Sequence, residues 1–227
     1  MGMYLGKEKV APAVKFEVQS MKAYLEAGGK CAWSSAKTFE GCWLASDWEN
    51  VTDFGNMFSY CRNITSFPIL DTSNATNMQS MFSECRGIKS IPAIDTSKVT
   101  NMRAMFSYCD HLTSIPALDT SKVEDMGYIF NYCSSLTSIP ALDTSNVKDM
   151  DYMFNNCYNL ESIHMHGMKI SFDIHYSTKF TREALVEILN NLSTVTTSRT
   201  LTMGSTNLAK LTDADKAIAT GKGWTLR

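Results

Sequence analysis

Cysteine is the residue of this 227-residue chain whose spacing is most regular and whose side chain is most reactive. Two of its seven cysteines, Cys31 and Cys42, precede a series with a step of 24 residues. That series is Cys61, Cys85, Cys109, Cys133 and Cys157. It contains no Cys-x-x-Cys pair, so a zinc ribbon or redox motif has no support. Identical positions facing a core are typical of buried thiols that act as small hydrophobes, with stacked disulfides or a metal site as the alternatives.

The four histidines offer a second, weaker candidate for chemistry. His164 and His166 are two residues apart, so on a strand both rings would lie on one face. His175 follows closely enough to lie near them. These three are candidate metal ligands, and histidines at the core edge or on the surface explain the same pattern equally well.

The sequence contains no Gly-rich phosphate loop, no nucleophile elbow and no pair of carboxylates beside a base. We therefore predict that the protein is not an enzyme and that it uses no cofactor. A metal-dependent enzyme built around the three histidines is the alternative from a different functional class.

The composition predicts a folded chain, because 44% of the residues are hydrophobic and 19% are charged. A net charge of −2 supplies no electrostatic footprint for nucleic acid or an acidic membrane. No stretch approaches the roughly 18 apolar residues that a membrane span requires. Charged residues 7–9 have no apolar segment behind them, so we expect no secretory signal peptide.

Four other residue types follow the same 24-residue period as the cysteines. They are Phe58, Phe82, Phe106, Phe130 and Phe154; Met78, Met102, Met126 and Met150; Pro68, Pro92, Pro116 and Pro140; and Asp71, Asp95, Asp119 and Asp143. A shortened copy, with Phe39, Cys42 and Asp47, precedes them. Self-similarity at a fixed period of this length is the signature of a solenoid.

Each repeat is predicted to have a helical half and an extended half. Apolar residues at 102, 105, 106 and 109 follow the spacing i, i+3, i+4, i+7, which indicates a short helix. Residues 112–118 are expected to be extended, because Pro116 forbids a helix and Ile115 suits a strand. Whether Ala117 or Leu118 points inward is left open by the pattern.

The Asp-Thr-Ser segment of each repeat, such as residues 119–121, is predicted to form the turn and N-cap that lead into the next helix. Stacked aspartates would repel one another unless each carboxylate is satisfied. Each can accept hydrogen bonds from the backbone amides of its own turn. A ladder of calcium ions is the alternative, although one carboxylate per turn is few for that ion.

These observations predict an α/β solenoid of about six 24-residue strand–helix turns, with a parallel sheet on one face and a cap at each end. Residues 1–30 are expected to form an N-terminal cap or assembly handle, 31–170 the solenoid with a truncated first turn, and 171–227 a C-terminal α/β cap. Within that cap we expect helices from Thr181 to about Leu192 and from Thr212 to Gly221. Strands are expected at 200–203 and at 224–226.

The segment MFSYCDHLTSIPALDTSKVEDM resembles the BspA-type leucine-rich repeat, the variant with a Met-Phe-x-x-Cys helix and an Asp-Thr-Ser turn. The resemblance covers roughly residues 39–168, and residues 180–227 are similar to the C-terminal cap that follows such repeats. It implies a leucine-rich-repeat fold. Relatives include bacterial cell-surface adhesins and proteins encoded by phages and prophages of gut bacteria.

The opening YLGKEKVAPAV is similar to the starts of phage-encoded relatives, whereas surface adhesins would carry a signal peptide and an anchor. The resemblance therefore implies a non-catalytic structural or tail-associated protein of a phage or prophage. Its location would be the virion, or the bacterial cytoplasm before assembly. Residues 1–27 would then mediate homo-oligomerisation or docking on the virion. A cell-surface adhesin is the alternative.

Differences between the repeats concentrate on the outer face of the predicted helices and just after the cysteines. Tyrosine and arginine gather there, and both are enriched at contact sites. The candidate binding residues are Tyr60, Tyr108, Tyr128, Tyr132, Tyr152, Tyr158, Arg62 and Arg86. The expected partner is a protein or a cell-surface glycan. Alternatively, these side chains shield the helical layer by packing turn on turn.

Overall fold

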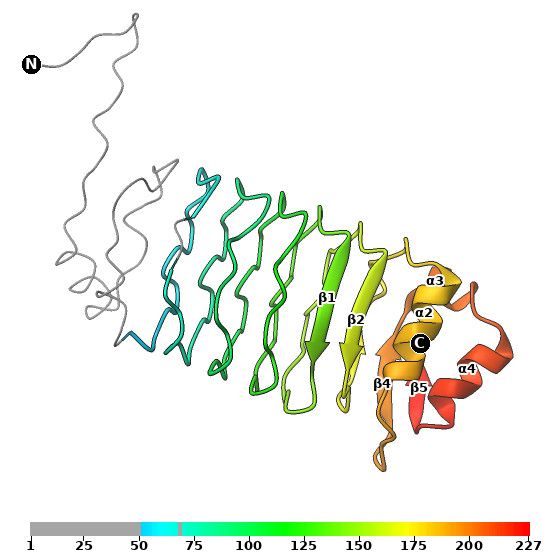
Figure 1. Ribbon diagram of the computed structural model, residues 1–227. Helices are drawn as coiled ribbons and strands as arrows, with labels where there is room; N and C mark the ends of the chain where they lie inside the picture. Colours follow the sequence, from blue (N-terminus) through cyan, green and yellow to red (C-terminus); the bar gives the residue numbers. More distant parts are fainter. Residues whose placement is uncertain (1–50, 68–69) are drawn as a thin grey trace, which may run out of the picture.

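The computed structural model describes residues 51–67 and 70–227. The predictions for residues 1–30, Cys31, the truncated turn with Cys42 and Pro68 lie outside these residues. Figure 1 shows a row of coils that ends in a helical unit at the C-terminus. In chain order the elements are β1 (Ser138–Asp143), β2 (Ser162–His166), β3 (Phe172–Asp173), α2 (Arg182–Asn191), β4 (Arg199–Thr202), α3 (Gly204–Leu208), α4 (Asp213–Thr220) and β5 (Trp224–Leu226).

The coils stack in parallel with the 24-residue step that the sequence predicts. Isolated parallel bridges join equivalent residues of successive coils, and they run through Asp53, Asn77, Asn101, Asp125 and Asp149. The same step pairs β1 with β2 in parallel, from Ser138 opposite Ser162 onward, with an irregularity between Ile139 and Leu142. The described chain thus contains small parallel sheets and few helices.

A column of phenylalanine rings forms the centre of the core. Successive rings lie 5.7, 5.7, 5.9 and 6.0 Å apart between centroids and are nearly parallel. The rings are those of Phe58, Phe82, Phe106, Phe130 and Phe154, and all five are fully buried. Each stacked pair adds about 0.5–1.5 kcal/mol to the burial of its surface. The methionine column is buried beside them, as predicted.

The predicted short helices are wrong, because residues 102–109 form successive β-turns. The amides of Met105 and Cys109 donate to carbonyls three residues back, at 3.1 Å each. Every second amide, starting at Met102, donates instead to the next coil, as Ala104 does to Gly127 at 2.8 Å and Tyr108 to Asn131 at 2.7 Å. The described chain before α2 accordingly contains no helix. We call these segments the turn-rich half of each coil.

Left-handed backbone geometry makes this pattern of hydrogen bonds possible. Ala104 has a φ of 53° and Tyr108 a φ of 60°. Equivalent pairs recur in the neighbouring coils, at Asn56 and Tyr60, Ser80 and Glu84, Tyr128 and Tyr132, and Tyr152 and Asn156. A right-handed helix would use each amide within its own segment. The left-handed residues turn every second amide toward the next coil.

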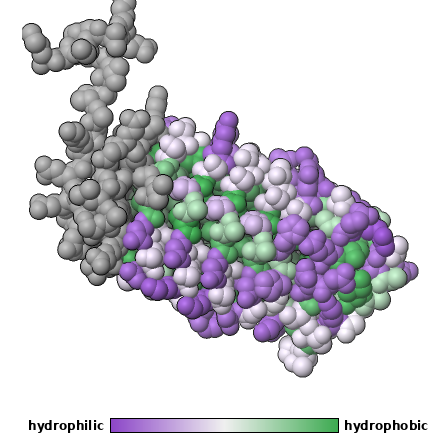
Figure 2. All heavy atoms as spheres, in the orientation of Figure 1, coloured by the Kyte–Doolittle hydropathy of each residue, from purple (hydrophilic) through white to green (hydrophobic). Residues whose placement is uncertain are grey.

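The extended half of each coil is held by a column of threonines. Leu118 is buried and Ala117 is exposed, which settles the orientation that the sequence left open. Thr120 Oγ1 donates to the Asp143 carbonyl at 3.0 Å and accepts from the Asp143 amide at 2.8 Å. Thr72 forms the same pair of bonds with Asp95. Figure 2 shows apolar side chains in the middle of this face and hydrophilic ones toward its edges.

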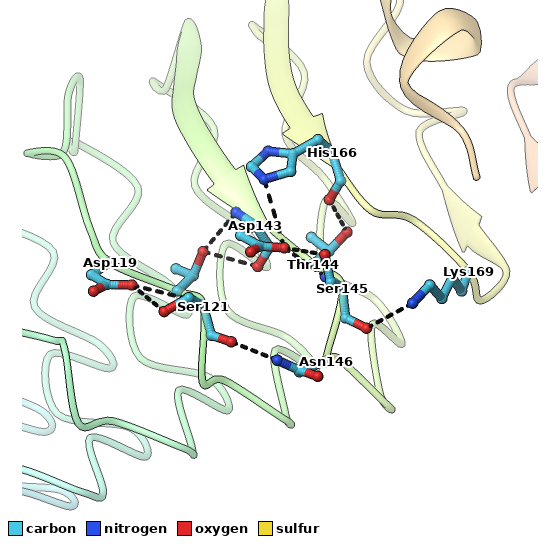
Figure 3. Close-up of polar contacts among 9 residues, drawn as sticks. Asp119, Ser121, Asp143, Thr144, Ser145, Asn146, His166 and Lys169 are labelled. Carbon is cyan, nitrogen blue, oxygen red and sulfur yellow. Dashed lines mark hydrogen bonds and ion pairs between the residues drawn. The ribbon is translucent and has the colours of Figure 1, made fainter.

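The predicted side-chain turns of the aspartate column are confirmed, but no helix follows them, so the N-cap role is wrong. Asp119 Oδ1 accepts from the backbone amide of Ser121 at 3.0 Å, and Asp143 Oδ1 accepts from that of Ser145 at 2.8 Å. Figure 3 shows these two turns in successive coils. Asp71 and Asp95 form the same contact.

The C-terminal unit matches the elements that the sequence predicted. Thr181 caps α2, and Thr212 caps α4 with a reciprocal contact from Asp215. The strands β3, β4 and β5 form a parallel sheet in that order. Two short elements, β3 and α3, were not predicted. Arg182 joins α2 to α4 through two hydrogen bonds to Asp215, at 2.8 and 2.7 Å.

Replacing Ala104 with glycine is expected to raise the free energy of unfolding by about 1 kcal/mol, because glycine adopts a left-handed φ without steric cost. The matched control is Ala117→Gly, at an exposed position in the extended half. It should lower stability by about 0.5–1 kcal/mol, since glycine costs more entropy on folding. Urea denaturation measures both. Destabilisation by Ala104→Gly to the same extent as the control would contradict the turn geometry.

Acid should weaken the turns of the aspartate column. Hydrogen bonds from Ser121 lower the pKa of Asp119 below its ordinary value of 3.8. A lowered pKa means that the contribution to stability is complete above about pH 4 and disappears as the pH falls through the folded value. Asp119→Asn keeps the acceptor oxygen, so urea denaturation should show a smaller acid-induced loss than in the parent chain. Equal losses would refute this role of the carboxylate.

Candidate functional site

The tyrosines of the turn-rich halves form two stacks, each headed by an arginine. In the Tyr132 stack, the Arg86 guanidinium lies 5.8 Å from the Tyr108 ring centre, and Tyr108 stacks on Tyr132 at 4.5 Å. The Tyr152 stack contains Arg103, Tyr128 and Tyr152, with corresponding separations of 4.9 and 4.9 Å. The side chains thus align from coil to coil along the turn-rich face.

Backbone hydrogen bonding between coils fixes where several of the tyrosine rings emerge. Five tyrosines of the turn-rich halves have φ between 55° and 65°, namely Tyr60, Tyr108, Tyr128, Tyr132 and Tyr152. Tyr128 donates its amide to the Asp151 carbonyl at 2.8 Å, and Tyr132 donates to Asn155 at 2.8 Å. Because the next coil holds the amides of Tyr128 and Tyr132, the backbone at these two residues has little freedom left to lose when a ligand binds their rings.

The structure separates some of the predicted binding residues and joins others. On a helix Tyr128 and Tyr132 would be neighbours four residues apart, but with no helix present each stacks in a different column. The inner rings Tyr108 and Tyr128 are half-buried. The outer rings keep 40% of their surface exposed at Tyr132 and 57% at Tyr152. Packing of turn on turn therefore coexists with exposed aromatic surface.

The remaining predicted binding residues lie on either side of the two stacks, toward the N-terminal and the C-terminal coils. At the N-terminal side, Tyr60 is 53% exposed, with the Arg62 guanidinium 5.7 Å from its ring centre. At the C-terminal side, Tyr158 is 49% exposed and its hydroxyl contacts Asn156. Tyr176 meets Tyr158 edge-on at 6.0 Å. We define the tyrosine surface as Tyr60, Tyr108, Tyr128, Tyr132, Tyr152, Tyr158 and Tyr176 with their three arginines.

Sequence reasoning missed Tyr176 and Arg103. Tyr176 lies 24 residues after Tyr152, so the period itself could have identified it. Arg103 has no counterpart in the other coils, and only the structure shows it over Tyr128. Its Nη1 lies 2.6 Å from Asp149 and 3.5 Å from Asp125. Partial burial opposes the charge of Arg103, but the two carboxylates outweigh it and raise its pKa.

At the Tyr132 stack, the carboxylate of Glu84 balances the positive charge of Arg86. It contacts Arg62 at 3.1 Å and Arg86 at 2.9 Å. The hydrogen bond and charge of Glu84 raise the pKa of Arg86. Both arginines predicted as binding residues are therefore tied to one carboxylate, and they lie against rings of the tyrosine surface.

The three candidate metal ligands do not converge. His164 and His166 are both exposed on β2, as the alternation predicted, but each faces its own carboxylate. His164 Nδ1 lies 2.7 Å from Glu187, and His166 Nε2 lies 3.7 Å from Asp143 (Figure 3). His175 Nδ1 lies 2.5 Å from Asp173. Among the described residues, no group of three metal-ligating side chains is present.

The cysteine column is buried and reduced in the described coils, as predicted, and its thiols also form hydrogen bonds. Cys109 Sγ donates to the Phe82 carbonyl at 3.1 Å, and Cys133 Sγ donates to that of Phe106 at 3.1 Å. Burial raises the pKa of Cys109 and Cys133 far above the ordinary value, and raises that of Cys157 to about 12. Because the thiolate is the nucleophile, these positions are inert.

Alkylation should confirm this inertness. Iodoacetamide at about pH 8.5 is expected to leave Cys109, Cys133 and Cys157 unmodified in the folded protein, because their burial suppresses the thiolate. Peptide mass spectrometry gives the extent of modification, and the urea-unfolded chain, which should be fully alkylated, is the control. Rapid modification of any of the three without unfolding would contradict the burial of this column.

A scan against protein-family models matches residues 30–138 and 76–185 to one family. No curated protein matches the chain. In the part of the chain that the structure describes, no helix is long and apolar enough to cross a bilayer. Because the two matches together span more than half of the sequence, the chain belongs to the family described as Mycoplasma protein of unknown function, DUF285.

Proposed function

We propose that this protein is a non-catalytic recognition module that contacts a protein or a glycan through its tyrosine surface. The observation that carries the proposal is the exposure of four tyrosine rings, between 40% and 57%, two of which, Tyr60 and Tyr132, have backbone amides that bond to the next coil. The rings are those of Tyr60, Tyr132, Tyr152 and Tyr158. Large rings with a polar end are the side chains that most often dominate binding energy.

The finer architecture belongs to the same proposal. We take the fold to be a leucine-rich-repeat solenoid of about six 24-residue turns, of the BspA type, closed by the C-terminal unit. The 24-residue columns and the parallel bridges from Asp53 to Asp149 support that view. In contrast to the expected repeat, the turn-rich half replaces a helix. A solenoid offers a long, continuous surface on which equivalent side chains repeat.

Rigidity favours recognition because the entropy cost of binding is met during folding. Tyrosine has only two side-chain torsions, and stacking restricts them further at Tyr108 and Tyr128. The backbone amides of Tyr108 and Tyr128 are already held by the neighbouring coil. A ligand that contacts these rings therefore immobilises little additional structure.

Several observations support a role without catalysis. The buried thiols are held in their protonated form by desolvation, so they are poor nucleophiles. The separation of His164, His166 and His175 removes support from the metal-dependent enzyme that was the alternative. What distinguishes the described surface is aromatic side chains rather than convergent acid–base groups.

For the biological setting, we propose a phage- or prophage-encoded structural or tail-associated protein, present in the virion or in the bacterial cytoplasm before assembly. The resemblance of the repeats and of the opening segment to such relatives supports this setting. The bacterial cell-surface adhesin remains the alternative. Both settings require a stable, non-catalytic contact surface.

Alanine substitution of the exposed rings tests the proposal. The variant Tyr132→Ala/Tyr152→Ala/Tyr158→Ala should bind glycan arrays or bacterial cells at least about tenfold more weakly than the parent chain, because exposed tyrosines are frequent hot spots. The labelled protein is applied to both, and bound label is measured. The control Ser90→Ala/Ser114→Ala/Ser138→Ala changes exposed positions in the extended half.

The control should bind like the parent chain. Equal binding by the tyrosine variant and the parent would exclude the tyrosine surface as the site. A loss confined to the serine variant would move the site to the extended half of the coils.

A further inference from the structure

The hydrogen bonds that join successive coils stop at the C-terminal end of the stack. Four alternate amides of residues 126–132 donate to the coil that follows, and Tyr132, for example, donates to Asn155 at 2.8 Å. The equivalent amides one coil later are those of Met150, Tyr152, Phe154 and Asn156. Among the described residues, none of these four donates to a backbone carbonyl. We call this break in the turn-rich half the seam.

The parallel pairing of the backbone ends at the same level. The bridges between coils stop at Asp149, and Asp173, one period later, pairs instead with Thr202 of β4. In the extended half, β1 and β2 form a sheet of their own, and the residues one period after β2 belong to helix α2 beside it (Figure 1). The phenylalanine column ends too, since Thr178 stands one period after Phe154.

Beyond the seam, residues 172–227 are tied to one another by contacts between distant segments. Lys222 Nζ donates to the Asn190 carbonyl at the end of α2, at 2.5 Å. Trp224 Nε1 in β5 donates to the Ser193 carbonyl at 2.9 Å. Together with the ion pair between α2 and α4, these bonds connect the helices of the C-terminal unit to its strands. The unit is therefore built to move as one body.

The C-terminal unit is attached unevenly to the coils. On the side of the extended half, residues 167–171 connect it to β2, and the Ser193 amide donates to the Met168 carbonyl at 3.0 Å. On the turn-rich side, one hydrogen bond crosses the seam in the described chain, from Ser177 Oγ to the Cys157 carbonyl at 2.9 Å. An attached edge opposite a loosely attached one is the arrangement of a hinge.

Apolar packing keeps the seam closed. Phe154 on the coil side is fully buried, and Ile174 and Phe180 of the C-terminal unit are 1% exposed. Tyr176 of the unit also meets Tyr158 of the last coil edge-on, at 6.0 Å. Elements that share few hydrogen bonds with their neighbours open at a lower free energy than the rest of a protein. Opening at the seam would separate Tyr176 from Tyr158 and thereby divide the tyrosine surface.

We propose that the C-terminal unit opens as one hinged body at the seam while the coils before it stay folded. Residues 167–171 are the hinge, and Gly167 begins it with a φ of 77°. This inference goes beyond the proposed recognition function and does not depend on it. A ligand that contacts Tyr158 and Tyr176 together binds the closed form alone and therefore favours closure.

Hydrogen exchange of the full chain at low urea, followed for each amide by nuclear magnetic resonance, tests the proposal. Amides of α2, α4 and β5 should share one opening equilibrium, with one common dependence on urea. That equilibrium should be at least about tenfold more favourable than the one at Tyr108 in the coils. The seam amides of Tyr152 and Phe154 should exchange at least as fast as the C-terminal unit, whereas Tyr128 and Phe130 should exchange with the coils.

A serine variant tests the contact that holds the seam. Ser177→Ala removes the hydrogen bond to the Cys157 carbonyl, so exchange in the C-terminal unit should accelerate by about threefold to tenfold, with Tyr108 unchanged. The matched control is Ser134→Ala, which removes a hydrogen bond of 3.3 Å to Asp110 between two coils. It should leave exchange in the C-terminal unit as in the parent chain.

A single opening equilibrium shared by the coils and the C-terminal unit would overturn the hinge, because the chain would then open only as a whole. Equal protection of Tyr152 and Tyr128 would show that the seam amides are paired and would contradict the seam. Equal acceleration by Ser177→Ala and Ser134→Ala would also count against it. The measurement uses no ligand, so its failure is distinct from a failure of the recognition function.

Discussion

The hydrogen bonds between coils are the constraint on which the rest of the structure depends. In the turn-rich half, every second amide donates to the coil that follows, as Phe82 does to Met105 at 2.9 Å and Phe106 to Ile129 at 3.0 Å. Buried backbone groups must be paired, so the register between coils is fixed. One inserted residue would misplace the phenylalanine, cysteine and threonine columns together. The 24-residue period is therefore a requirement of the hydrogen bonding as well as of the packing.

The cysteine and threonine columns complete the same system. The Phe82 carbonyl accepts from the Cys85 amide at 3.1 Å and from Cys109 Sγ at 3.1 Å. A thiol is small enough for the core and is also a weak donor, so it combines apolar packing with a hydrogen bond. Thr120 serves the extended half, where it donates to and accepts from Asp143. Both residue types thus connect neighbouring coils through side-chain hydrogen bonds to the backbone.

The tyrosines of the proposed recognition surface occupy backbone conformations that are energetically unfavourable. A non-glycine residue in the left-handed region costs roughly 1–2 kcal/mol, and glycine would avoid that cost. Five tyrosines nevertheless occupy such positions, and stacking of Tyr108 on Tyr132 offsets part of the cost. Backbone conformations of this kind often lie at functional sites. The placement of tyrosine at these positions is therefore consistent with a role for the rings at the surface.

The sequence predicted the register, the core columns and the C-terminal elements, because each depends on a local signal. Thr181 and Thr212 are helix caps, and the columns show their period directly. It failed in the turn-rich half, because residues 102–109 bury the same positions in successive turns as they would in a helix. Apolar spacing reports which side chains face inward and not which carbonyl receives each amide. Arg103 was missed because a contact between coils leaves no trace in the spacing of one coil.

The central claim is that alternate amides of the turn-rich half bond to the next coil. Scalar couplings across hydrogen bonds, measured by nuclear magnetic resonance on the ¹⁵N,¹³C-labelled chain, identify the acceptor of each amide. The structure predicts a coupling between the Tyr108 nitrogen and the Asn131 carbonyl carbon, which lie across a hydrogen bond of 2.7 Å. A coupling from Tyr108 to Ala104 instead would indicate a helix and contradict the account.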